Sequence, residues 1–331
     1  MTNGMQETLK NNLWLLTASS ILHFLVDGLC VCCLYLMVSS ESMALMTGVF
    51  LTYNILAFMT QPLTGMCADS SRLRPWLLPL AAALLTSAVL LAAWWHDAGG
   101  MTPSSGAMLT VATLLGMGNS CFHVWGGKLT AARTGNDMRA LGVFVSTGAM
   151  GLSVGLVFCS WPLLLAFLLL MGIMTMICWL YASKNETNSE QQTAKCEPRI
   201  TKTLIWIAMA ALIGFVMFRS YVGEIFTHGV SKTQTLVMII GATSMIGKMA
   251  GGWLAKRVGI VGALAIALVT VAVCFIGKNY NVAIFLAGLF AINLTMPVTL
   301  YLANVALKGR EGLAFGWLAA ALIPGYLIAI W

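Results

Sequence analysis

Long apolar runs, separated by short polar breaks, follow one another along almost the whole chain. An α-helix needs about 20 mostly apolar residues to cross a bilayer, because the hydrocarbon core is about 30 Å thick and each residue rises about 1.5 Å. The pattern therefore predicts eleven spanning helices. They cover residues 13–38, 43–61, 75–95, 107–130, 140–160, 161–181, 204–228, 234–254, 259–277, 280–304 and 312–331.

The predicted fold class is an all-α polytopic membrane protein. A bilayer leaves no water for unpaired backbone groups, so only helices and closed β-barrels cross it. Barrel strands alternate polar and apolar residues over short segments, whereas runs such as 76–95 and 161–181 are continuously apolar. The first run, 13–38, is also too long for the core of a signal peptide.

Composition agrees with a surface covered by lipid. Hydrophobic residues make up 59% of the 331 positions, charged residues only 9%, and the mean hydropathy is +0.88. A soluble domain carries about 25% charged residues, so a water-facing surface of this size is excluded. We expect a lipid bilayer around the protein, no nucleic-acid partner despite the formal charge of +7, and a monomer.

The 18 lysines and arginines are distributed unevenly between the two ends of the predicted helices. Fourteen fall on the side of the N-terminus and two, Lys232 and Lys278, on the other side, while Arg219 and Lys248 lie inside helices. Basic residues concentrate in short cytoplasmic loops. The asymmetry predicts a cytoplasmic N-terminus in a bacterial-type plasma (inner) membrane, and eleven crossings then place Trp331 outside.

One long polar stretch, 182–202, has the composition of a solvated linker. We expect it to be cytoplasmic and to join a six-helix bundle at 1–181 to a five-helix bundle at 203–331. Residues 65–72, after the second helix, correspond weakly to 252–259, after the eighth. Two parallel repeats are the plan of major facilitator transporters, and on that plan the twelfth helix is absent.

Three stretches of the first half resemble the major facilitator superfamily, and within it the fosmidomycin-resistance-type efflux branch. They are HFLVD at 23–27, QPLTGMCAD at 61–69 and GMGNSCFH at 116–123. The resemblance implies two bundles that rock around a central cavity lined by helices 1, 4, 7 and 10. The chain departs from the family pattern at Ser70, Arg72, Val124 and Lys256.

Gly65, Asp69, Arg72 and Arg74 lie at the cytoplasmic end of the second predicted helix and just after it. In the family that the chain resembles, such a loop locks the two halves together through ion pairs and a helix terminus. We therefore assign these four residues to a gating motif. An ordinary positive-inside loop would account for the arginines but not for the aspartate.

His23 and Asp27 lie four residues apart, on one face of the first helix, with Asp27 near the middle of the membrane. A carboxylate at that depth costs about 2.5–3.5 kcal/mol, so intramembrane acids usually face a polar cavity. The pair is predicted to couple transport to protons, with Asp27 as the carrier and His23 as a relay or support. The alternative is a structural hydrogen bond between helices.

Five further polar residues are assigned to the substrate cavity, because they lie in helices 4, 7 and 10, which the resemblance places around it. They are Asn119, His123, Arg219, Glu224 and Asn293. Arg219 is expected to meet Asp27 or an anionic substrate. His123 has the alternative role of a packing residue.

Nine cysteines, including a C-x-x-C spacing at 30–33 inside an apolar run, match neither a disulfide framework nor a metal site. The sequence contains no H-E-x-x-H, G-x-S-x-G or P-loop motif. We therefore expect no metal, no cofactor and no enzymatic activity. The predicted function is proton-coupled efflux of a small organic molecule by alternating access. The alternatives are a proton-coupled symporter that imports a small solute and a non-transporting membrane sensor or scaffold.

Overall fold

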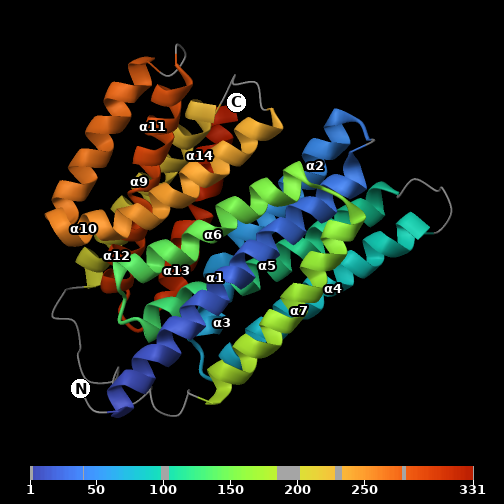
Figure 1. The fold of residues 1–331 in the computed structure, drawn as a ribbon, viewed down its shortest axis with the longest axis horizontal. Helices are drawn as coiled ribbons and strands as arrows, with labels where there is room; N and C mark the ends of the chain where they lie inside the picture. The colour runs from blue at the N-terminus through green and yellow to red at the C-terminus, as the bar shows by residue number, and fades with distance from the viewer. Residues whose placement is uncertain are drawn as a thin grey trace.

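The computed structural model describes residues 3–39, 41–97, 104–184, 202–227, 233–277 and 281–330. Within these ranges the chain is helical apart from short connections (Figure 1). The first part contains α1 (Asn3–Val38), α2 (Met43–Asn54), the π-helical η1 (Ile55–Met59), α3 (Gln61–Asp69), α4 (Arg74–Asp97), α5 (Ser105–Arg133), α6 (Met138–Val157) and α7 (Trp161–Lys184). The second part contains α9 (Lys202–Thr227), α10 (Gln234–Gly277), α11 (Val282–Asn293), α12 (Met296–Ala306), α13 (Glu311–Ala320) and α14 (Leu322–Ile330).

Ten helical stretches of the described residues are long and apolar enough to cross a membrane. One of them, α10, runs for 44 residues and bends at Gly259, whose φ of 78° lies in the left-handed region that favours glycine. Its two arms correspond to the predicted helices 234–254 and 259–277, and they diverge from the bend in Figure 1. The all-α membrane fold is therefore confirmed, and about eleven spans agree with the structure.

Prolines mark two interruptions within the predicted spans. The segment predicted at 43–61 extends to Asp69, and Pro62 lies in the first turn of its last piece, α3. Pro297 lies in the first turn of α12, after α11. Proline lacks a backbone N–H, so the first turn of a helix, where that group has no helical partner, is a favourable position for it. Each proline therefore sits where the backbone ladder begins again.

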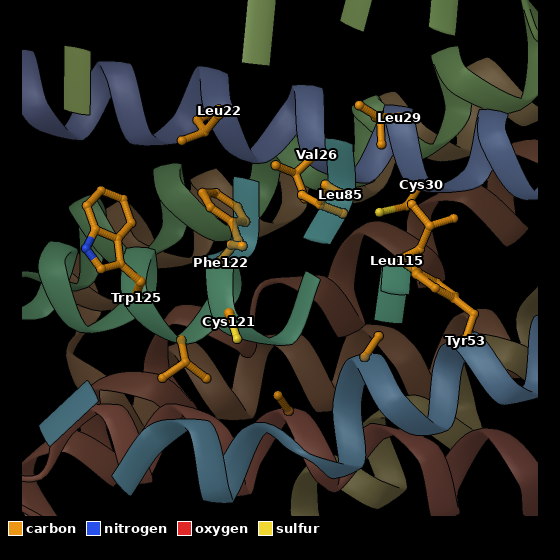
Figure 2. Close-up of a cluster of buried hydrophobic side chains, with 14 of the residues drawn as sticks. Leu22, Val26, Leu29, Cys30, Tyr53, Leu85, Leu115, Cys121, Phe122 and Trp125 are labelled. Atoms are coloured by element: carbon orange, nitrogen blue, oxygen red, sulfur yellow. The ribbon is translucent and has the colours of Figure 1, made fainter. Parts of the chain in front are cut away.

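A stripe of apolar residues on α1 packs into the core of the first part. Leu22, Val26 and Leu29 recur at helical spacing and are at most 1% exposed. Figure 2 shows them on the side of α1 that faces α5, where Phe122 lies. Positions 23 and 27 adjoin this stripe, so the packing of α1 also fixes the direction of its polar side chains.

Glycines allow α6 to lie close to both parts of the molecule. Gly151 lies against the backbone of Phe24 in α1, and Gly142 lies against the backbone of Lys248 in α10. A side chain at either glycine would collide with a backbone oxygen. Small residues are the usual means by which membrane helices approach closely. Helix α6 therefore bridges α1 and α10.

The two parts of the molecule meet at the end that carries the N-terminus (Figure 1), where the backbones of Gly65 in α3 and Gly312 in α13 are in contact. At the opposite end a recess of about 620 Å³ lies between α1, α2, α6 and α14, with Tyr35 and Tyr326 among its walls. The structure is thus closed at one end and recessed at the other. The predicted linker, 182–202, lies mostly outside the described residues, and the division at that point stays a prediction.

Candidate functional site

The polar face of α1 carries His23 and Asp27, which are 4% and 7% exposed. His23 Nδ1 lies 2.7 Å from the carbonyl oxygen of Phe144 in α6. His23 Nε2 lies 3.3 Å from Asp27 Oδ2, one helical turn away. The predicted pair is therefore in contact, and α6 fixes the plane of the His23 ring.

Helix α5 adds two of the predicted cavity residues to this pair. The side-chain amide of Asn119 donates to Asp27 Oδ1 at 3.1 Å and to the hydroxyl oxygen of Tyr53 at 2.9 Å. His123 Nδ1 lies 3.0 Å from the backbone carbonyl oxygen of Asn119, and its Nε2 lies 2.8 Å from His23 Nε2. Asp27 thus sits among two imidazoles and an amide.

Gly148 of α6 makes room for this cluster. A β-carbon at position 148 would collide with Asp27 Oδ2 and His23 Nε2. The cluster therefore depends on a helix face that presents no side chain at this point. Sequence analysis missed Gly148, because a glycine inside a membrane helix gives no sign of which neighbour it accommodates.

His23, Asp27 and His123 offer one ligand atom each within 4.8 Å of one another, a spacing that can hold a metal ion. A tetrahedral ion bonded to nitrogen at about 2.05 Å would hold two such ligands about 3.3 Å apart. The 2.8 Å between the two Nε2 atoms is shorter and has the length of a hydrogen bond. The arrangement therefore fits a proton between the rings better than a tetrahedral metal.

A cavity of about 220 Å³ lies between the two parts of the molecule. His23, Asp27 and His123 form part of its wall on the side of α1 and α5. Arg219 of α9 and Lys248 of α10 form part of the wall on the other side. One carboxylate therefore faces a cavity that also holds two basic side chains.

Arg219 is 8% exposed, and its Nη1 atom has no hydrogen-bond partner in the described part of the chain. No ion pair joins it to Asp27 among the described residues, although both line the cavity. A buried guanidinium with an unused donor is costly unless a ligand or a water molecule in the cavity supplies an acceptor. This wall is therefore suited to an anionic or strongly hydrogen-bonding group.

The other predicted cavity residues are distributed more widely. Asn293 lines the cavity, although its side-chain amide donates to Leu289 O at 2.8 Å. Asn119 is not among the residues that line the cavity, but it contacts two of them, Asp27 through its side-chain amide and His123 through its backbone carbonyl oxygen. Glu224 is half-buried and is not among the residues that line the cavity.

Sequence analysis gave Lys248 no role, although it lies in a predicted helix. Sequence analysis noted it only as a charge inside that helix, near its cytoplasmic end, and the structure places it in the cavity wall. The cost of a charge within a membrane helix was the signal that could have identified it. Gln61 was quoted only within the family motif, and it lines the same cavity.

Asp69, in the predicted gating motif, lies at the closed end between the two parts of the molecule. Its Oδ1 accepts hydrogen bonds from Gly312 N at 2.9 Å and Lys128 Nζ at 2.8 Å, and its Oδ2 accepts one from Leu313 N at 2.9 Å. Gly312 and Leu313 begin α13, so the carboxylate also meets the positive end of that helix. The cation in this contact is Lys128 of α5, to which sequence analysis assigned no role.

The other members of that motif have different surroundings. Gly65 permits the backbone contact with Gly312. Arg72 is exposed, and Arg74 begins α4. The structure therefore brings Gly65 and Asp69, but not Arg72, to the contact between α3 and α13.

A second polar contact lies at the same end of the molecule. Asp137 caps α6, and its carboxylate lies 2.6 Å from Arg139 and 3.8 Å from Lys256 of α10. The hydrogen bond from Arg139 holds the pKa of the Asp137 carboxyl below its usual range. Lys256, at the position where the family repeat has an aspartate, thus lies near a carboxylate of the first part.

Under the alternating access that the sequence resemblance implies, replacing Asp69 with asparagine is expected to slow the cycle about tenfold with little change in the equilibrium affinity for substrate. The substitution removes the charge from three hydrogen bonds, and charged hydrogen bonds contribute about 1.5–3 kcal/mol. Flux and binding by Asp69→Asn should be compared in one preparation, with Arg72→Gln as the matched control at an exposed position. An unchanged rate would reduce this loop to a signal of membrane orientation.

Comparison with known proteins places the chain in a family. The profile of the Major Facilitator Superfamily matches residues 6–329. The comparison with curated proteins gave no match. Solved structures with low sequence identity resemble this fold. A variant of the E. coli fucose:proton symporter FucP has a TM-score of 0.61 at 14% identity, over 95% of this chain and 89% of that one.

Another similar fold is that of a bacterial homologue of the iron transporter ferroportin, in an outward-facing state with soaked iron. It has a TM-score of 0.57 at 16% identity, over 95% of this chain and 92% of that one. Identities this low establish a shared fold and no more. With the family match over nearly the whole chain, the spanning helices and the cavity, they lead to one assignment. The chain is an integral membrane protein that belongs to the Major Facilitator Superfamily of transporters.

Proposed function

We propose that the protein is a proton-coupled secondary transporter that exports a small organic anion by alternating access. The observation that carries the proposal is the cavity between the two parts of the molecule. A buried group of titratable side chains, His23, Asp27 and His123, lies in one wall, and Arg219 and Lys248 lie in the other. Coupling of anion transport to proton movement requires a proton site and an anion site that influence each other, and this cavity places candidates for both side by side.

Alternating access supplies the mechanism. Contacts of Asp69 with Lys128 and the start of α13 would hold the cytoplasmic end closed, while the opposite end carries a recess. Rocking of the two bundles of helices about the cavity would break the Asp69 contacts and reverse the access. Transport requires the proton and the substrate to bind and leave as the cavity opens to each side in turn.

Export rests on the resemblance to the fosmidomycin-resistance-type branch. A second candidate is proton-coupled import of a small organic anion. It is supported by electrostatics, since a proton on one wall and an anion near Arg219 attract each other and therefore favour joint binding in a cavity of about 220 Å³. The similar fold of FucP, described as a fucose:proton symporter, points the same way.

Flux through proteoliposomes tests the proposed function. A panel of small carboxylates, phosphate esters and neutral analogues should be assayed with and without an imposed pH gradient. We expect gradient-dependent flux of at least one anion and little flux of its neutral analogue. Flux of no compound under either condition would favour the non-transporting sensor or scaffold.

Membrane orientation is a separate prediction. The basic residues predict a cytoplasmic N-terminus and an external Trp331. Reporter fusions that are active only in the cytoplasm should therefore work near Asn188, in the predicted linker, and fail after Trp331. Activity at both positions would mean an even number of crossings in the second bundle.

A further inference from the structure

We propose that His23 and His123 share one excess proton between their Nε2 atoms, and that Asp27 remains an ionised partner beside them. The role of this proton in coupling rests on the proposed function, whereas its position rests on geometry alone. The proton carrier would then be the histidine pair, in place of the aspartate predicted from the sequence.

The hydrogen-bond partners of the two rings fix their tautomers. His23 Nδ1 faces the carbonyl oxygen of Phe144 at 2.7 Å, and His123 Nδ1 faces the carbonyl oxygen of Asn119 at 3.0 Å. A carbonyl oxygen only accepts hydrogen bonds, so both Nδ1 atoms must carry protons. A neutral imidazole has one N–H, and both Nε2 atoms are then bare acceptors.

Two bare nitrogens cannot bond to each other, yet the Nε2 atoms of His23 and His123 lie 2.8 Å apart. Asp27 adds its oxygens to the same space, at 3.3 Å from His23 Nε2 and 3.5 Å from His123 Nε2. Three acceptors would therefore meet in a site where each residue is less than 10% exposed. One cation among them is needed to make these contacts favourable.

A proton on Asp27 would not meet this need. Its hydroxyl could donate to one Nε2 atom only, and the two nitrogens would still face each other without a hydrogen. The nitrogen–nitrogen distance is also the shortest of the three contacts. A proton between the nitrogens makes one ring an imidazolium that donates to the other, with the Asp27 carboxylate as its counter-charge.

Other charged and titratable groups face this cluster from the surrounding helices. Asp27 and Cys30 lie on α1, Tyr53 reaches Asn119 from α2, and Arg219 and Lys248 line the same cavity from α9 and α10. The two cations oppose an excess proton, and an anion bound beside them would offset that repulsion. Binding of an anion and retention of the shared proton should therefore favour each other, which agrees with the import candidate more than with export.

Nitrogen-15 NMR of the histidine-labelled, purified protein reports the shared proton directly. The chain has only four histidines, so His96→Gln and His228→Gln leave the pair intact and assign the remaining signals. We expect protonated Nδ1 atoms in both rings at neutral pH and a coupling between the two Nε2 atoms across one hydrogen. The Asp27→Asn variant should lose that coupling.

Two results would overturn the proposal. One is a proton on Nε2 of either ring with a bare Nδ1, which would contradict the assigned tautomers. The other is a metal ion retained at one per chain after purification, measured by elemental analysis. Neither measurement requires a transported compound. Failure of the shared-proton proposal can therefore be distinguished from failure of the proposed transport function.

Coupled flux distinguishes the histidine pair from Asp27 as the carrier. His123→Gln keeps a polar side chain but cannot share a proton with His23, so the ratio of gradient-driven flux to exchange flux should fall at least about tenfold. His96→Gln, away from the cavity, is the matched control and should keep both activities. Full gradient-driven flux by His123→Gln would return the carrier role to Asp27.

Discussion

Asp27→Asn is expected to abolish flux driven by a pH gradient and to leave exchange of substrate between equal concentrations largely intact. This result is expected because asparagine retains the shape of the side chain but cannot hold a negative charge. Without that charge, the imidazoles of His23 and His123 lose their counter-ion at 3.3 and 3.5 Å, and a buried cation has no partner. The substitution is expected to remove coupling whether the proton binds to the carboxylate or to the histidines.

The measurement compares gradient-driven and exchange flux of one compound in matched proteoliposomes. Glu41→Gln, in the loop between α1 and α2, removes a carboxylate away from the cavity and serves as the control. Both variants should be monodisperse and have similar melting temperatures. Gradient-driven transport by Asp27→Asn at the wild-type rate would remove this cluster from the coupling mechanism.

Arg219→Gln is expected to weaken binding of the anionic substrate by about ten- to a hundredfold. A hydrogen bond to a charged group contributes about 1.5–3 kcal/mol, and about 1.4 kcal/mol corresponds to a factor of ten in affinity. The Nη1 atom of Arg219 has no partner among the described residues, so the substrate is the proposed acceptor. Arg219→Lys should fall between the two, because lysine keeps the charge but loses the planar fork.

Equilibrium binding of a transported anion and of its neutral analogue measures this effect. The loss should be large for the anion and small for the analogue. A cysteine at position 219, in a background without reactive thiols, should also react with a water-soluble reagent. Equal affinity for the anion, together with protection from labelling in every state, would identify Arg219 as a structural residue.

Sequence analysis predicted the polar faces of individual helices but not how those faces meet. His23 with Asp27, and Asn119 with His123, are each four residues apart, and that spacing places each pair on one helix face. The contact between the two histidines joins residues 100 positions apart. It depends on the packing of α1 against α5 and α6, which no local pattern encodes.

Sequence analysis predicted that Asp69 belongs to a contact between the two halves, but it did not identify the partners of the carboxylate. Asp69 stood out because a positive-inside loop does not explain an acid. Its partners, Lys128 and the backbone of Gly312 and Leu313, come from α5 and α13. The arginines close to Asp69 in sequence are not these partners, since proximity along the chain does not determine which side chain points inward.

The fold itself followed from hydrophobicity, because a bilayer allows few alternatives. The bend of α10 at Gly259 was also placed correctly, between the predicted helices 234–254 and 259–277. The breaks at Pro62 and Pro297 were not predicted, since each segment remains apolar across the interruption. Hydropathy reports depth in the membrane and is insensitive to a local loss of helical hydrogen bonds.

Proton movement driven by substrate tests the proposed coupling most directly. Lightly buffered proteoliposomes with a pH-sensitive dye inside should be loaded with a transported anion and diluted into medium without it. Proton-coupled export predicts that the lumen becomes more acidic as the anion leaves, because protons enter in exchange. Proton-coupled import, run in reverse, predicts that the lumen becomes more alkaline. With either mechanism, Asp27→Asn should show no change in lumen pH. Anion efflux by the wild-type protein with no change in lumen pH would contradict coupling to protons.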